Sequence, residues 1–424
     1  MSRRGNRVWR LVALALAGTL VMAACGDDDE DGATTQTTAG GGGAKKTVSI
    51  AFVGAKTGDN ANLGLNIRDG VKLATDEENA KGGDVTIALK EFDTAGDPAQ
   101  ATTIKDQFIA DESIVGIVGP AFSGETKALI PPLNEAGLVM ISPSATNKAL
   151  PTVVPGGARV FHRALGDDIL QANGIAQYLA TVEKPRNAAY VHDNSEYGKG
   201  LTVDTEKAAS LKRVRTALVE TVDPKAQDFS ATVNKVKAAS PDLVFYGGYY
   251  AEAGRFKKQL ADAGVTAKFV SGDGSLDPGF VTAAGPDIAE GARITCPCNL
   301  AFENSTGRLK EFYDNFKKEI GREPGLYSPE GYDSAKILIQ GIKAGNDTRE
   351  KLLNWIEQDF TRYEGVSKPI EFEENGNLKA TQFFVFQVKD GKIVPGQTLP
   401  VEDPAGNTST TAASGGGTTT TTTG

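Results

Sequence analysis

The stretch "IVGIVGPAFSGETKAL", residues 114–129, joins an apolar run to a polar segment through a short loop. Residues 114–119 are apolar or glycine without alternation, which is typical of a parallel strand that helices cover on both faces. The pattern then becomes polar, and we expect Ser123 to cap a helix that begins in the loop. The stretch therefore predicts one βα unit, with its loop at the carboxyl end of a strand.

Units of this kind recur along the chain, because short apolar runs alternate with amphipathic segments. Repeated βα units build doubly wound α/β sheets, and the length of the body predicts two of them. One predicted helix, 97–112, has Asp97 as its N-cap and Pro98 at its first position. The other predicted helices include 228–240, 308–321 and 348–360, and the predicted strands are 47–54, 85–93, 114–119, 137–143, 187–193, 215–222, 241–249 and 267–272.

The two ends of the chain differ from the body in composition. A basic start and the apolar run Leu11–Ala24 are typical of an export signal, 1–24, that is too short for a membrane span of about 20 residues. Cys25 follows directly and resembles the lipid-anchored cysteine of a bacterial lipobox; an uncleaved anchor and an ordinary secretory signal are the alternatives. We expect residues 25–46 to be the lipidated cysteine and a flexible tether, and the Thr/Gly-rich tail 403–424 to be disordered.

Composition and motifs argue against nucleic-acid binding and catalysis. The chain carries 45 basic and 54 acidic residues and no basic stripe, so we expect no nucleic-acid partner. Its two histidines, His162 and His192, lack metal-binding spacing, and we find no nucleophile–base motif and no Walker loop. We therefore expect no enzyme, no metal and no cofactor. Cys296 and Cys298 are too close in sequence for an unstrained bridge, and free or weakly paired thiols are the simpler expectation.

Hydroxyl side chains follow two of the predicted strands. Ser123 comes after the strand 114–119, and Ser144 and Thr146 come after the strand 137–143. Ligands of doubly wound sheets bind beyond the carboxyl ends of the strands. Hydroxyls and free backbone N–H groups at helix starts suit a small carboxylate, although plain helix caps without a ligand are the alternative.

Several stretches together resemble the leucine/isoleucine/valine-binding protein family, the type I solute-binding proteins that serve ABC importers. They lie in order between about residues 48 and 390: "VGAKTGDNANLG", "ENAKGGDVTI", "EFDTAGDPAQA", "MISPSAT", "VHDNSEYGKGL", "DFSATVNKVK", "DLVFYGGYYAEAG" and "NGNLKATQFFVFQV". The resemblance implies a type I periplasmic binding protein fold with two lobes joined by three crossovers. Lobe one would be 47–166 plus 297–366 and lobe two 167–296 plus 367–402, with the two cysteines at a crossover, where a bridge could tune closure.

The resemblance also implies roles for single residues. Ser123, Ser144 and Thr146 would hold the carboxylate and ammonium of an amino acid, and Asp273 would pair with the ammonium, although the family usually has Glu there. A buried ammonium needs such an anionic partner. The implied ligand contacts are completed by Leu63, Phe122, Tyr197, Tyr249 and Tyr327.

The aromatic and apolar positions bear on the side chain of the ligand. Tyr197 and Tyr249 would close over the ligand from lobe two, and Tyr327 would form an aromatic wall, while packing in the core or hinge is the alternative for all three. Leu63 stands where the family often has an aromatic residue, and with Phe122 it favours an aliphatic side chain.

The function that the resemblance implies is that of an extracytoplasmic lipoprotein, monomeric and anchored to the membrane. It would trap a branched-chain amino acid between its lobes and deliver it to an ABC permease. The alternatives are a receptor for aromatic amino acids or for short amides and urea, and a sensing module without a transporter. Asp273 argues for a ligand with a cationic amino group, which amides lack.

Overall fold

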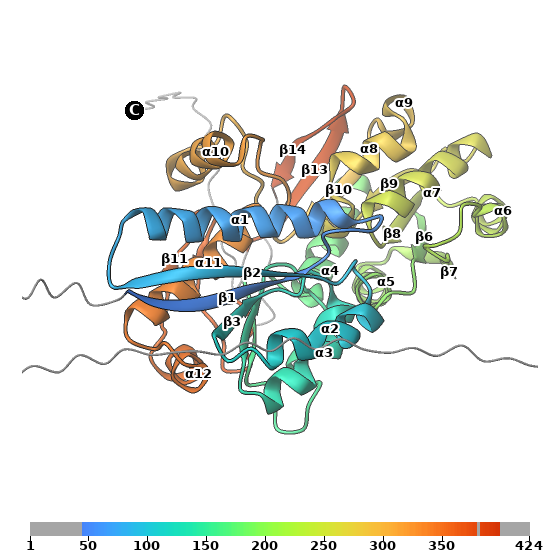
Figure 1. The fold of residues 1–424 in the computed structure, drawn as a ribbon. Helices are drawn as coiled ribbons and strands as arrows, with labels where there is room; N and C mark the ends of the chain where they lie inside the picture. Colours follow the sequence, from blue (N-terminus) through green and yellow to red (C-terminus); the bar gives the residue numbers. More distant parts are fainter. Residues whose placement is uncertain (1–44, 380–381, 399–424) are drawn as a thin grey trace, which may run out of the picture. The chain divides into compact units, whose positions relative to one another are not determined.

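The computed structural model describes residues 45–379 and 382–398, in which two parallel-type sheets are covered by helices (Figure 1). The export signal, Cys25 and the tail 403–424 lie outside the described residues. Within the described part, no helix has both the length and the apolarity that a membrane span requires.

The first sheet has five parallel strands in the order β2-β1-β3-β4-β5. The interior strand β1 is buried along its last seven residues, because helices cover the sheet on both faces. Figure 1 shows α1 on one side of the strands and α2 and α3 on the other. The elements are β1 (Lys46–Gly54), α1 (Ala61–Ala80), β2 (Val85–Asp93), α2 (Pro98–Ile109), β3 (Ile114–Val118), α3 (Ser123–Glu135), β4 (Val139–Ser142), η1 (Leu150–Thr152) and β5 (Phe161–Arg163).

The second sheet has seven strands in the order β14-β13-β10-β9-β8-β6-β7. Its strands are parallel from β7 to β10, while β13 and β14 form an antiparallel hairpin at one edge. The elements are α4 (Asp168–Tyr178), η2 (Leu179–Glu183), β6 (Asn187–His192), α5 (Glu196–Leu211), β7 (Arg215–Thr221), α6 (Ser230–Ala239), β8 (Leu243–Gly247), α7 (Tyr250–Asp262), β9 (Lys268–Ser271), η3 (Asp273–Ser275), α8 (Pro278–Ala284), α9 (Pro286–Ala289), β10 (Arg293–Cys296), β13 (Phe384–Lys389) and β14 (Lys392–Thr398).

The remaining elements return to the first sheet. Helix α11 packs along α1, and α12 contacts β3 and β4. Helix α10 shares a hydrophobic cluster with α1, in which Leu73 meets Phe312 and Phe316. We call the first sheet with its helices and α10–α12 lobe one, and the second sheet with its helices lobe two. The elements are α10 (Gly307–Ile320), α11 (Ser328–Lys343), α12 (Arg349–Gln358), β11 (Tyr363–Glu364) and β12 (Pro369–Ile370).

The chain passes between the two lobes three times: after β5, after β10 and before β13. The predicted fold class, two doubly wound α/β lobes with three crossovers, is thereby confirmed. The residue limits that we predicted for the lobes stay a prediction.

Two local expectations were wrong and one was confirmed. Asp97 caps α2 as predicted, since its Oδ1 accepts from the N–H of Ala99 at 2.7 Å. Ser123, in contrast, is the first residue of α3, and Phe122 takes the N-cap position. Cys296 and Cys298 are not free thiols but form a disulfide, with Cα atoms 5.0 Å apart.

Candidate functional site

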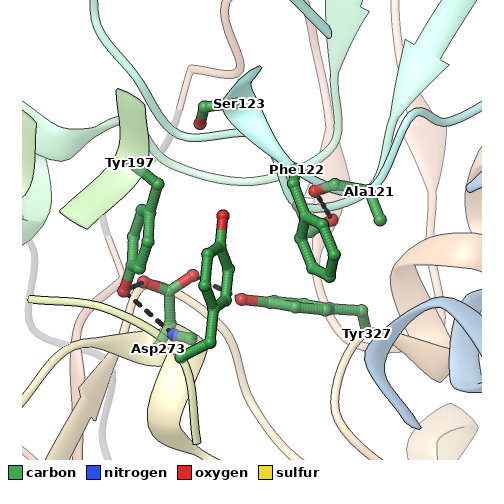
Figure 2. A pocket seen from close by; sticks show the side chains of 9 residues that line it. Ala121, Phe122, Ser123, Tyr197, Asp273 and Tyr327 are labelled. Carbon is green, nitrogen blue, oxygen red and sulfur yellow. Dashed lines mark hydrogen bonds between the residues drawn. The ribbon is translucent and has the colours of Figure 1, made fainter. Parts of the chain in front are cut away.

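A small cavity between the lobes collects most of the residues that the sequence predicts for the site (Figure 2). Its enclosed space is about 10 Å³, room for about one water molecule. Both lobes contribute residues to its lining. Every lining residue lies just beyond the carboxyl end of a strand or at the start of a helix, where ligands of such sheets bind. The lining residues are Ala121, Phe122, Ser123, Ser144, Tyr197, Tyr249, Asp273, Gly274 and Tyr327.

Asp273 is the charged group of this cavity and is only 1% exposed. It follows β9 in lobe two, and its Oδ1 accepts from the hydroxyl of Tyr197 at 2.7 Å. Its Oδ2 accepts from the hydroxyl of Tyr327, which belongs to lobe one, so that this bond joins the two lobes. Figure 2 shows the two tyrosines reaching Asp273 from opposite sides.

The protonation of these three groups follows from burial. Burial raises the pKa of Asp273, and the hydroxyl groups of Tyr327 and Tyr197 offset part of the increase. Burial, followed by the charge of Asp273, raises the pKa of both tyrosines well above the ordinary range. The tyrosines therefore stay neutral donors, and Asp273 lacks a cationic partner among the residues that line the cavity.

The loops of lobe one bring hydroxyl groups to the opposite wall. Ser144 donates to the carbonyl of Ala121 at 2.5 Å, which ties the loop after β4 to the loop after β3. Ser123 Oγ accepts from the N–H of Asn147 at 3.2 Å, and Ser123 begins α3. The partial positive charge of a helix start and a nearby hydroxyl make this wall suited to a carboxylate.

A buried polar layer that the sequence did not predict supports the wall. Arg163 is fully buried and donates to the carbonyls of Ala145 and Asn147 at 3.1 and 3.0 Å, so it holds the loop that carries Thr146. The N–H of Asp168 donates to the carbonyl of Thr146 at 2.8 Å. Among the described residues, neither the carboxylate of Asp168 nor the hydroxyl of Thr146 has a hydrogen-bond partner. Burial raises the pKa of Asp168 well above its usual range.

Aromatic rings close the cavity from both lobes. The ring centroids of Phe122 in lobe one and Tyr249 in lobe two are 4.6 Å apart, and those of Tyr249 and Tyr197 are 5.2 Å apart. The N–H of Phe122 donates to Glu125 Oε2 at 3.1 Å, and the N–H of Tyr249 donates to Glu252 Oε1 at 2.7 Å. Burial raises the pKa of these glutamates to about 7 and about 8.

Two of the predicted residues do not line the cavity. Leu63 is fully buried in the core of lobe one, and Thr146 is fully buried without lining the cavity. Ala121, Gly274 and the supporting Arg163 were missed. The first two carry no functional group that would point to a site, and a charged side chain such as that of Arg163 usually lies at the surface.

Further polar contacts join the two lobes. Lys127 of α3 pairs with Glu196 of α5 at 2.8 Å, and Asn147 Nδ2 donates to the carbonyl of Glu196 at 2.6 Å. Lys148 pairs with Asp204, also on α5. Helix α5 of lobe two therefore lies directly on the loop of lobe one that holds Ser144 and Thr146.

A larger groove of about 1120 Å³ lies elsewhere, between α8, the loop 300–304 and β14. It contains none of the predicted site residues and is mostly apolar, with Glu303 and Lys392 among its exposed residues. Among the described residues, no cluster of three or more His, Cys, Asp or Glu side chains could hold a metal ion. We place the candidate site at the small cavity, because buried charge and hydroxyl groups converge there.

The periplasmic binding protein family model matches residues 47–392, which is most of the chain and includes every lining residue. The chain belongs to this family. Its members bind solutes and are not enzymes, in line with the missing nucleophile–base motif. The predicted family is thereby confirmed.

Relatives of this binding protein carry informative names. The "Leucine-, isoleucine-, valine-, threonine-, and alanine-binding protein" of Pseudomonas aeruginosa is 29% identical over 344 residues, which cover 80% of this chain and 90% of the relative. "Leu/Ile/Val-binding protein homolog 3" of Brucella melitensis is 30% identical over 352 residues, covering 82% and 93%.

A solved structure agrees with the fold. The branched-chain amino acid transporter substrate binding protein LivJ of Streptococcus pneumoniae, in complex with isoleucine, superposes with a TM-score of 0.76 at 26% identity. The match covers 84% of this chain and 99% of that protein. This binding protein therefore has the fold of a family of transporter substrate-binding proteins.

Proposed function

We propose that this protein is the substrate-binding component of an ABC importer and traps an aliphatic α-amino acid between its lobes. The observation that carries the proposal is Asp273, a buried carboxylate that the lobes share through Tyr327 and Tyr197. An unpaired buried charge is costly, and an ammonium group from the ligand is the partner that removes the cost.

The loops of lobe one, opposite Asp273, suit the carboxylate of the ligand. Ser123 at the start of α3 and Ser144 beside it supply a hydroxyl and backbone donors for the ligand's carboxylate. In addition, Thr146 and Asp168 are fully buried and carry polar atoms without hydrogen-bond partners in the described residues. A zwitterionic α-amino acid matches both charges at once.

The names of the relatives support an amino acid and a transporter. Two relatives are named for leucine, isoleucine and valine, and LivJ is named for branched-chain amino acid transport. An aromatic amino acid, a short amide or urea, and a sensing role without a permease are the alternatives. Lipidation of Cys25 and a monomeric state complete the proposal and remain predictions.

Isothermal titration of the purified full chain, unfolded and refolded to remove any carried ligand, tests the proposal. We expect binding at micromolar or lower Kd for at least one of glycine, alanine, valine, leucine and isoleucine, and none for acetamide. Binding of acetamide alone would contradict the ammonium role of Asp273. Binding of phenylalanine alone would replace the aliphatic ligand by an aromatic one.

A further inference from the structure

We propose that Phe122 sets the upper size of the ligand's side chain, so that the site takes small α-amino acids such as alanine or glycine in preference to leucine. The inference rests on the proposed function and narrows the substrate class of the same site. Its basis is an aromatic contact that bridges the lobes beside the seat of the head group.

The backbone of Phe122 is fixed. Its N–H donates to Glu125 Oε2 at 3.1 Å, and its carbonyl accepts from the N–H and the hydroxyl of Thr126 at 3.0 and 2.9 Å. The next residue, Ser123, is the proposed carboxylate contact. The ring of Phe122 therefore begins one residue from the head group and cannot shift along the chain.

The ring has no room to withdraw into lobe one. A Cβ placed on Gly96 would lie 2.7 Å from Cε2 and 3.2 Å from Cδ2 of Phe122, so the ring edge rests on the backbone of Gly96. Gly96 has φ of 75°, a conformation that suits glycine. The side chain is 7% exposed, which agrees with a ring held on several sides.

Tyr249 blocks the ring on the side of lobe two. The two ring centroids are 4.6 Å apart, with planes inclined by 52°. Tyr249 is supported in turn by Tyr197, and a Cβ on Gly274 would lie 3.0 Å from its Cδ1. Phe122 and Tyr249 thus form one aromatic wall across the interface.

The free-energy cost of opening the cavity has two parts, one for the head group of the ligand and one for its side chain. The cavity of about 10 Å³ must widen for every amino acid, and that cost is common to all of them. A side-chain carbon that enters between Phe122 and Tyr249 must in addition part the two rings, because their centroids are only 4.6 Å apart. One surplus methylene in a filled pocket costs about 10- to 200-fold in discrimination.

The position of Leu63 supports the same assignment. The resemblance implies that Leu63 and Phe122 share the contact with the ligand's side chain, but Leu63 lies in the core of lobe one and only Phe122 lines the cavity. The size limit is therefore assigned to Phe122.

The test is isothermal titration of the refolded full chain with glycine, alanine, valine and leucine. For the wild type we expect alanine to bind at least about tenfold more tightly than leucine. In Phe122→Ala the leucine affinity should rise at least about tenfold relative to that of alanine, and Phe122→Leu, which keeps an apolar side chain, should fall between them. Phe302→Ala, in the larger groove, is the control and should keep the wild-type preference.

The outcomes separate the two proposals. Wild-type protein that binds leucine as tightly as alanine overturns the size limit and leaves the proposed function standing. The size limit is equally wrong if Phe122→Leu and Phe122→Ala weaken alanine and leucine alike. If wild type and variants bind no amino acid while their circular dichroism shows native folding, the proposed function itself is wrong.

Discussion

Replacing Asp273 by Asn is the sharpest test of the proposed ammonium seat. The substitution keeps the size of the side chain and an oxygen that accepts from Tyr197, but it removes the charge from a group that is 1% exposed. Losing one partner of a buried, hydrogen-bonded ion pair costs about 3–5 kcal/mol. We therefore expect the Kd for the best amino acid ligand to rise by a factor of about 10² to 5 × 10³.

The pH dependence gives the same test a second readout. Burial raises the pKa of Asp273 in the free protein, and an ammonium ligand binds its ionised form. A protonated Asp273 must lose its proton before it can pair, so wild-type affinity should rise with pH through this pKa and level off above it. In Asp273→Asn this rise should be absent.

Calorimetric titration across pH 4–8 measures both effects. Asp333→Asn is the matched control, because Asp333 is equally buried but belongs to lobe one away from the cavity, and burial raises its pKa to about 8. The control should keep wild-type affinity. An unchanged Kd in Asp273→Asn would refute the reasoning and remove Asp273 from the site.

Two further substitutions test the frame of the site. Glu125 has a folded pKa of about 7, above its usual 4.5, so its contribution to stability is complete below pH 4.5 and is lost as the pH rises through 7. Denaturant titration should therefore show that Glu125→Gln gains about 2–3 kcal/mol over the wild type between pH 5 and pH 8; an equal difference at both pH values would contradict this. A Cβ on Gly200 would lie 2.8 Å from Asn147 Nδ2 across the lobe interface and 3.1 Å from Asp168 Oδ2. Gly200→Ala should weaken ligand binding about tenfold, about 1.4 kcal/mol, without lowering the melting temperature, since alanine favours the helix; unchanged affinity would show that α5 does not bear on closure.

Long apolar runs made most of the fold predictable. All eight predicted strands are present, with ends that shift by at most a few residues, because a strand buried on both faces needs a continuous apolar run. Strands β11, β12, β13 and β14 were not predicted, and neither were β5 and β10, which have only three and four residues. Runs of this length show no period, and their pairing with longer neighbours defines them.

The residues of the candidate site were predictable only where a polar side chain also follows a predicted strand. Ser123, Ser144 and Asp273 follow strands directly, and loops at the carboxyl ends of parallel strands converge. Arg163 and Asp168 were missed because charged residues usually lie at the surface, whereas both are fully buried here. Tertiary packing therefore determines the support of the site.

We expect the ligand, and not the protein's own contacts between the lobes, to determine the population of the closed form. The ion pairs Lys127–Glu196 and Lys148–Asp204 each include a lysine about half exposed, and such pairs contribute about 0–1 kcal/mol. The bond from Tyr327 to Asp273 adds a neutral donor to a buried charge, which leaves the charge uncompensated. An ammonium group adds the missing charge at this shared carboxylate, while a carboxylate binds the other wall. A ligand with both groups contacts both lobes only when they are closed, and this differential affinity shifts the population toward the closed form.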